Sequence, residues 1–134
     1  MGNFNVIYLG QLRCEATHNA SGTKILTDAP VDNHGRGEAF SPTDLVCTAL
    51  ATCVITTIGI WAGKENIELN GTTIDVSKTM QGSPRKIARI DLILNVTGSL
   101  LTENQKSKLE EIAHHCPVAI SLHPDIVQNM EFNY

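Results

Sequence analysis

The feature that most constrains this chain is an apolar stretch at residues 41–62, SPTDLVCTALATCVITTIGIWA. Ser41 and Asp44 predict a capping box, and Pro42 fits the first position of a helix. The Asp44 carboxylate also lies at the positive end of the helix dipole. Eighteen uncharged residues follow, 45–62, before Gly63 and Lys64 indicate the end of the helix. Because apolar side chains occur all around this helix, we expect every side of it to be buried.

Such a helix is also long enough to cross a membrane. Four threonines lower its hydrophobicity, and no cluster of Lys or Arg flanks either end. The rest of the chain alternates polar and apolar residues as soluble sheets do. We therefore expect no membrane association, and instead a helix covered by a sheet on one side and by another helix or a second subunit on the other.

Length and charge exclude several classes of protein. A chain of 134 residues suits one domain, spanning residues 1–134. The net charge of −4 and the lack of a basic run argue against nucleic-acid binding. Residues 1–10 alternate polar and apolar side chains and do not form the continuous apolar segment of a signal peptide. The predicted location is the cytoplasm.

The remaining elements follow from periodicity and turn residues. Strands are predicted at residues 3–9, 12–18, 23–27, 72–80, 86–96 and 126–132, helices at 102–115 and 117–122, and an exposed loop at 28–37. The strand at 86–96 alternates most clearly, with Ala88, Ile90, Leu92, Leu94 and Val96 facing inward. The helix at 102–115 opens with a second capping box, Thr102 to Gln105. The predicted fold class is α+β, with a three-stranded meander before the long helix.

The chain has four cysteines, Cys14, Cys47, Cys53 and Cys116, and no C-x-x-C pair. In the cytoplasm such cysteines are either buried small hydrophobic residues or reactive thiols. Cys53 lies at the middle of the long helix among small neighbours, where core packing is the alternative to reactivity. Cys116 precedes a predicted helix start, whose backbone N–H groups favour a thiolate.

Two further features have an open interpretation. His114, His115, Cys116 and His123 suggest a metal site, but they lack the ligand spacing of zinc sites, so we expect no metal. Arg13 is a charge inside a predicted strand. It is either a solvated edge residue or a partner for a carboxylate or a thiolate.

Two motifs carry a resemblance to a known family. PTDL at residues 42–45, leading through Ala-Leu-Ala-Thr to Cys53, and Cys116 followed by Pro117 after an amphipathic helix resemble the OsmC and organic hydroperoxide resistance (Ohr) family. The similarity covers nearly the whole chain, including TDAP at residues 27–30. It implies an intertwined homodimer with its long helices buried between two sheets and its active site at the subunit interface.

The resemblance also implies a mechanism. Cys53 would attack an organic hydroperoxide as a thiolate, and the resulting sulfenic acid would form a disulfide with Cys116. An external dithiol of the dihydrolipoyl type would regenerate the thiols, with no bound cofactor. Arg13 matches the arginine that activates the thiolate in the family's peroxidases.

One position departs from the family. The established peroxidases carry Glu directly after the helix proline, where this chain has Thr43, and the carboxylate comes one residue later at Asp44. One residue turns a side chain by about 100° around a helix, so we expect Asp44 to cap the helix. Thr43, Asp44 and Leu50 are our candidate substrate contacts. The alternative function is a non-peroxidase member that binds a small hydrophobic ligand or senses redox state at the dimer interface.

Overall fold

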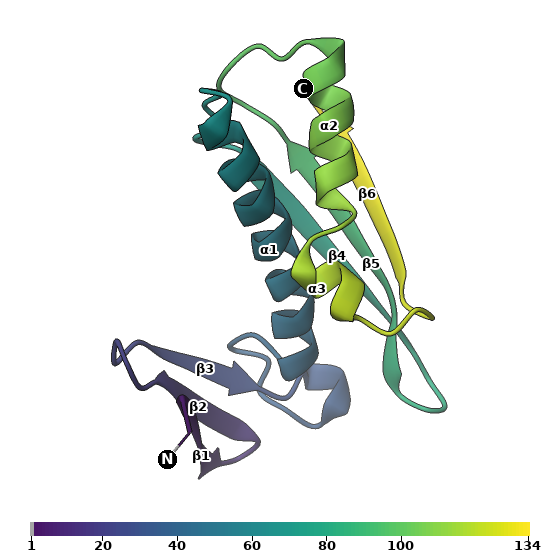
Figure 1. The fold of residues 1–134 in the computed structure, drawn as a ribbon. Coiled ribbons are helices and arrows are strands. Elements are labelled where there is room, and N and C mark those ends of the chain that lie inside the picture. The colour runs from purple at the N-terminus through teal and green to yellow at the C-terminus, as the bar shows by residue number, and fades with distance from the viewer. Residues whose placement is uncertain (1) are drawn as a thin grey trace. The chain divides into compact units, whose positions relative to one another are not determined.

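The computed structural model describes residues 2–134, which divide into two compact units. The first ends at Val46 and the second runs from Cys47 to Tyr134. The elements follow the predicted order of three strands, a helix, two strands, two helices and a strand (Figure 1). The predicted α+β class is therefore confirmed. The long helix α1 (Pro42–Lys64) begins in the first unit and continues through the second.

The first unit is an antiparallel meander of β1 (Phe4–Gly10), β2 (Arg13–His18) and β3 (Lys24–Asp28). Its strands are short and its sheet has no apolar core of its own, because no hydrophobic side chain in residues 2–46 is buried. The exposed large apolar residues of this unit are Phe4, Val6, Ile7, Tyr8, Leu9, Leu12, Ile25, Leu26, Val31 and Phe40.

The second unit contains a sheet in the order β4 (Thr73–Gln81), β5 (Lys86–Asn95) and β6 (Val127–Asn133). The first pair is antiparallel and the second parallel. The part of α1 in this unit lies on the same side of the sheet as α2 (Glu103–Ala113) and α3 (Pro117–Ser121), as Figure 1 shows.

The core of this unit is centred on β5. Ile90, Leu92 and Leu94 alternate along the strand and have no exposed surface, which confirms the predicted inward face. The alternation changes at one end of the strand, because the pairing register shifts between Thr79 and Met80. As a result Ile87 is buried there, and Ala88, predicted to face inward, is only half-buried.

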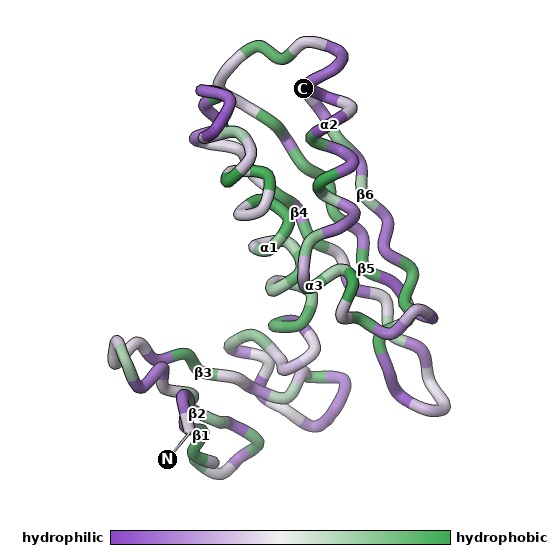
Figure 2. The backbone as a smooth tube through the Cα atoms, in the orientation of Figure 1, coloured by the Kyte–Doolittle hydropathy of each residue, from purple (hydrophilic) through white to green (hydrophobic). Residues whose placement is uncertain are grey.

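Helix α1 contributes one stripe to the core. Its buried residues are Cys47, Leu50, Ala51, Val54, Ile58 and Ala62, which recur at the three- and four-residue spacing of one helix face. Figure 2 shows that α1 is mainly apolar along its length, yet Ile60 is 59% exposed. A single chain therefore does not bury the helix on every side.

By length and composition alone, α1 is long and apolar enough to cross a membrane, and 33% of its most apolar segment is buried inside the chain. The core helices of soluble proteins can have the same length and composition. The absence of membrane association stays a prediction.

The predicted helix starts are confirmed. Ser41 and Asp44 exchange hydrogen bonds, from the Ser41 N–H to Asp44 Oδ2 at 2.9 Å and from the Asp44 N–H to Ser41 Oγ at 3.0 Å. Thr102 and Gln105 form the equivalent box at α2. Pro117 begins α3, and Cys116 is its N-cap. Each box satisfies two backbone N–H groups that a helix end leaves without partners.

The prediction of an exposed loop from residue 28 is wrong at its first residue. Asp28 is the last residue of β3 and only 1% exposed. The segment after it contains a short 3-10 helix, η1 (Val31–Asn33). The loop therefore begins one residue later and is partly ordered by its own backbone.

We expect Leu92→Ala to lower the free energy of unfolding by about 2–5 kcal/mol, because it leaves a cavity in the core. The matched control is Ile93→Ala on the other face of the same strand, where the side chain is 36% exposed. Its loss should be less than half as large. Urea denaturation measures both values, and equal losses would contradict the assigned inward face.

Candidate functional site

The second unit brings two thiols together. Cys53 lies at the middle of α1 and is half-buried, with Thr57 Oγ1 at 4.0 Å from its sulfur one turn further along. Cys116 lies between α2 and α3 and is completely buried. The turn after α2 thus places the Cys116 thiol within hydrogen-bonding reach of Cys53. All four cysteines are free thiols in this structure.

The surroundings shift the pKa values of these two thiols in opposite directions. Burial alone would raise the pKa of the Cys53 thiol, but hydrogen bonds from the Val118 N–H, from Cys116 and from Thr57 stabilise the thiolate and bring the pKa below its ordinary value. Burial raises the pKa of the Cys116 thiol. The hydrogen bond of Cys116 to Cys53 and the negative charge of an ionised Cys53 raise this pKa further. Of the two thiols, Cys53 is therefore the one that ionises more readily, with Cys116 as a hydrogen-bond donor to it.

Cys116 is fixed by the backbone of α3. The Ala119 N–H donates to Cys116 Sγ at 3.4 Å, as expected for the N-cap position. The Val118 N–H, which interacts with Cys53, comes from the same turn. Sequence reasoning did not identify Val118, because the group that acts is its backbone N–H, which every residue except proline carries.

The other two cysteines are apart from this pair. Cys47 is 1% exposed and faces the core from α1. Cys14 lies on β2 opposite Tyr8 and Thr27 and is half-buried. Cys47 and Cys53 are six residues apart on α1, which places them on different sides of the helix, and their exposure differs accordingly.

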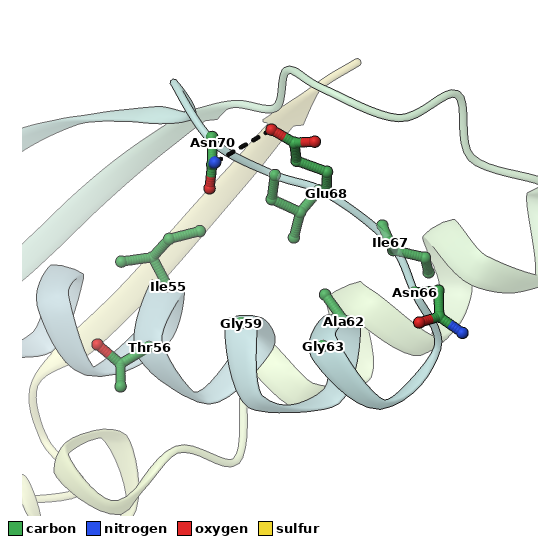
Figure 3. Close-up of a pocket in the computed structure, with 10 residues that line it drawn as sticks. Ile55, Thr56, Gly59, Ala62, Gly63, Asn66, Ile67, Glu68 and Asn70 are labelled. Carbon is green, nitrogen blue, oxygen red and sulfur yellow. Dashed lines mark hydrogen bonds between the residues drawn. The ribbon is translucent and has the colours of Figure 1, made fainter.

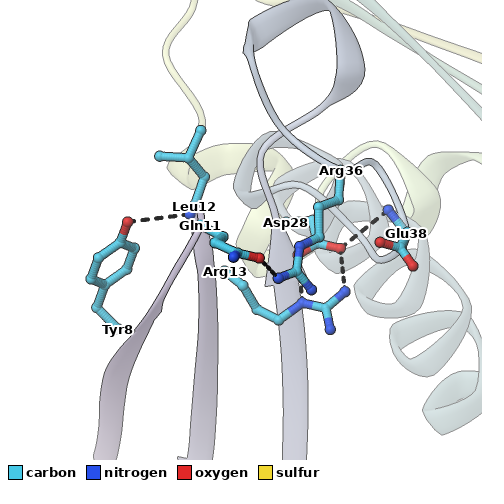
Figure 4. Close-up of polar contacts among 7 residues, drawn as sticks. All are labelled: Tyr8, Gln11, Leu12, Arg13, Asp28, Arg36 and Glu38. Carbon is cyan, nitrogen blue, oxygen red and sulfur yellow. Dashed lines mark hydrogen bonds and ion pairs between the residues drawn. The ribbon is translucent and has the colours of Figure 1, made fainter.

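In the first unit, Arg13 forms a two-point ion pair with Asp28. The Arg13 Nε donates to Asp28 Oδ1 at 2.7 Å and Nη2 to Oδ2 at 2.8 Å (Figure 4). The Arg13 hydrogen bond is the main cause that lowers the pKa of the Asp28 carboxyl. The Arg13 side chain is 22% exposed, so it is not a solvated edge residue.

Asp28 is the residue that sequence reasoning missed. It was assigned to an exposed loop, where a carboxylate has no required partner. The signal was present, since a hairpin turning at residues 20–22 places Arg13 directly opposite Asp28, as observed.

The predicted substrate contacts have different surroundings. The Asp44 carboxylate caps α1, as expected, and the Thr43 hydroxyl lies 3.2 Å from Ser41 Oγ. Leu50 has no exposed surface and packs in the core of the second unit. In a single chain Leu50 is therefore shielded, and contact of these three residues with a substrate stays a prediction.

The histidine cluster has no metal-binding geometry. Within residues 2–134, no group of three or more His, Cys, Asp or Glu side chains is placed to hold a metal ion. His115 Nδ1 lies 2.8 Å from the Glu111 carbonyl oxygen, and His123 Nδ1 accepts from the Asp125 N–H at 3.0 Å. Cys116 is engaged at the start of α3.

A groove of about 680 Å³ opens along the C-terminal half of α1. Figure 3 shows Ile55, Thr56 and Gly59 of the helix on one side and the segment at residues 66–70 on the other. Glu68 and Asn70 are joined there by a hydrogen bond of 3.0 Å. No cysteine lines this groove, so it is distinct from the thiol pair.

The comparisons with known proteins agree with this arrangement. The model of the OsmC-like protein family matches residues 35–131. A candidate osmotic stress induced and detoxification response protein from Psychrobacter arcticus is 43% identical, with 98% of this chain and 96% of that chain covered and a TM-score of 0.94. No curated protein shows a significant match to the chain.

More distant structures share the fold. An organic hydroperoxide resistance protein OsmC from Legionella pneumophila is 19% identical, with 98% of this chain and 95% of that chain covered and a TM-score of 0.77. The organic hydroperoxide resistance protein OhrB of Bacillus subtilis is 18% identical, with 98% and 97% covered and a TM-score of 0.66.

We expect iodoacetamide at about pH 7 to alkylate Cys53 roughly 10 times faster than Cys116, because the thiolate is the nucleophile and only Cys53 has a lowered pKa. The alkylation rate of Cys53 should level off at a lower pH than the rate of an ordinary thiol does, because its pKa is lowered. Mass spectrometry of the cysteine peptides over a pH series measures both. Equal rates at Cys53 and the buried Cys47 would contradict the assignment.

Proposed function

Since this chain belongs to the OsmC-like protein family, we propose that it is a thiol peroxidase that reduces organic hydroperoxides to alcohols. The family and the structures of organic hydroperoxide resistance proteins support a redox or peroxide-stress role. The single observation that carries the finer proposal is the pair of Cys53 and Cys116, which share a hydrogen bond and have opposite pKa shifts.

In the proposed first step, the Cys53 thiolate attacks the outer oxygen of the hydroperoxide. A sulfur–oxygen bond forms, the O–O bond breaks, and the alkoxide takes a proton to leave as an alcohol. Cys53 is oxidised to a sulfenic acid. The hydrogen bonds from Thr57 and the Val118 N–H support this step, because they stabilise the attacking anion.

In the second step, Cys116 attacks the sulfur of the sulfenic acid, a disulfide forms and water leaves. The raised pKa of Cys116 suits a resolving thiol that stays protonated until Cys53 is oxidised. An external dithiol, of the dihydrolipoyl type in the family, then restores both thiols by exchange. We propose no bound cofactor.

We further propose that Arg13 is the cation that stabilises the thiolate and the developing alkoxide. Its guanidinium has five N–H donors, of which the ion pair with Asp28 uses two. A fixed positive charge of this kind lowers a thiol pKa. We propose that the substrate contacts Thr43, Asp44 and Leu50. We also propose that the protein is located in the cytoplasm.

The rival is a non-peroxidase member that binds a small hydrophobic ligand. The groove beside α1, with Ile55 and Leu69 in its lining, is the observation that favours it. This groove contains no thiol, so such a function would not require Cys53 or Cys116.

Consumption of cumene hydroperoxide with dihydrolipoamide as reductant tests the peroxidase. We expect turnover by the wild type and a loss of about 100-fold or more in Cys53→Ser, because the nucleophile is gone. Cys116→Ser should react once and then turn over slowly, since its sulfenic acid has no internal thiol to resolve it.

Cys14→Ser is the matched control, because Cys14 lies on β2 and is not part of the proposed pair. It should keep the wild-type rate. A wild-type rate no higher than that of the free dithiol would contradict the peroxidase, and the ligand-binding function would then be preferred.

We also propose a homodimer with the active site at the subunit interface. Two surfaces of the single chain support it: the meander, whose apolar side chains are all at least partly exposed, and the exposed side of α1 around Ile60. Many exposed large apolar side chains of this kind are typical of protein interfaces. A second copy that covers both surfaces would supply the burial expected for α1.

Sedimentation equilibrium should give twice the chain mass of 14.5 kDa. Ile60→Glu should raise the dissociation constant about 10-fold or more, because it places an unpaired charge in an apolar interface. Leu100→Glu, at a fully exposed loop position, is the control and should leave the dimer unchanged. A monomeric wild type at micromolar concentration would contradict the dimer.

A further inference from the structure

The contact between Arg13 and Asp28 is built into the sheet. The two residues lie directly opposite each other on β2 and β3, and both guanidinium–carboxylate hydrogen bonds are shorter than 3 Å. Two parallel bonds between planar groups fix the orientation of the guanidinium as well as its position. One edge of Arg13 is thus held by Asp28, and the N–H groups of the other edge face away from it (Figure 4).

Asp28 is itself held by the loop that follows β3. Its Oδ2 also accepts the Glu38 N–H at 3.1 Å, and its own N–H donates to the Phe40 carbonyl oxygen at 3.1 Å. The loop returns to this point through a bond from the Gly37 N–H to the Ala29 carbonyl oxygen at 3.1 Å. The carboxylate is 1% exposed and fully engaged, as a buried charge must be.

Gly37 is the residue that permits this return. Its φ is +62°, and a Cβ there would lie 2.8 Å from Val31 Cγ2. Both facts favour glycine at this position. The loop is therefore shaped so that the next residue, Glu38, directs its N–H at Asp28.

The other side of Arg13 is also constrained. Gln11 and Leu12, just before it, have φ values of 53° and 63°, which side-chain-bearing residues rarely adopt. The Leu12 carbonyl oxygen accepts the Ala29 N–H at 3.1 Å, and the Leu12 N–H donates to the Tyr8 hydroxyl at 3.2 Å. Positive φ at both loop residues is typical of the two-residue type I′ turn of a hairpin, which joins β1 to β2 and places Arg13 at the first position of β2.

The charges nearest this pair are those of Arg36 and Glu38. Arg36 contacts the Gln11 side chain. The pKa of Asp28 is lowered mainly by its hydrogen bond with Arg13 and to a smaller extent by Arg36, and the pKa of Arg13 is raised mainly by its hydrogen bond with Asp28 and to a smaller extent by Glu38. Asp28 is thus ionised and Arg13 protonated at neutral pH. Arg13 is therefore a permanently charged, oriented guanidinium within a neutral ion pair, and its charge does not depend on titration near pH 7.

We propose that Asp28 is the positioning residue of Arg13, orienting the guanidinium toward its reaction partner while the Asp44 carboxylate caps α1. This inference rests on the proposed function, in which Arg13 acts on the Cys53 thiolate. Thr43 has no carboxylate, and the two-point contact of Arg13 is made with Asp28. Asp28 touches no reacting atom in this scheme and acts only through Arg13.

The test measures the rate of Cys53 alkylation by iodoacetamide against pH, which requires no peroxidase activity. Asp28→Asn keeps the shape of the side chain and removes its charge. We expect the midpoint of the Cys53 profile to rise by about one pH unit, and the rate at neutral pH to fall about 10-fold, because a loosened Arg13 stabilises the thiolate less well.

A double-mutant cycle then separates positioning from structural damage. In an Arg13→Ala background, Asp28→Asn should add less than about 2-fold, because Asp28 acts through the side chain already removed. Glu38→Gln is the matched control. It removes a nearby negative charge but keeps the backbone N–H that Asp28 accepts, so its midpoint should match the wild type.

An alkylation profile of Asp28→Asn identical to that of the wild type would overturn the inference. It would also be overturned if Arg13→Ala and Asp28→Asn lowered the alkylation rate independently, so that the double mutant showed the product of the two single effects. If Asp28→Asn fails to fold, judged by circular dichroism, Arg13→Lys decides, since lysine keeps the charge but makes no two-point contact. An upward shift of the Cys53 midpoint in Arg13→Lys supports the inference, and an Arg13→Lys profile identical to wild type overturns it. A wild type without peroxidase turnover but with these shifts would refute the peroxidase alone.

Discussion

The rest of the structure depends on where α1 can bury its apolar surface. The helix has no polar side, yet the second unit covers only the stripe from Cys47 to Ala62. The first unit also leaves apolar surface exposed, because its sheet has no apolar core. Apolar surface of this kind is typical of protein interfaces, and it is the support for the proposed dimer.

The two proposed reactive groups, the Cys53 thiol and the Arg13 guanidinium, are held in place by different kinds of contact. The Cys53 thiol lies among groups that donate to it, and the start of α3 supplies two of them, the Cys116 thiol and the Val118 N–H. Arg13 is prepared by a rigid carboxylate contact inside a small sheet. In both cases backbone N–H groups contribute, from Val118 to Cys53 and from Glu38 to Asp28. Backbone donors are well suited to this, because they are held by the fold and lose little freedom.

The success of sequence reasoning varied with the range of the interactions involved. Both capping boxes and the inward face of β5 were predictable, because they depend on residues within a few positions of each other. Ala88 was misplaced because the bulge between Thr79 and Met80 is set by pairing with another strand. Asp28 was missed because its importance comes from a partner 15 residues away, although a hairpin register could have revealed it.

The sequence by itself determined the order of the elements, the helix starts and the α+β class, since these depend on local periodicity and on the hydrogen bonds of helix N-termini. It also pointed to Cys53 and Cys116 as the notable thiols. Only the tertiary structure decided that these thiols share a hydrogen bond and differ in pKa, because burial and donors come from separate elements. It likewise decided that Arg13 is held by Asp28, since a two-point ion pair requires two strands in register and a loop that closes over them.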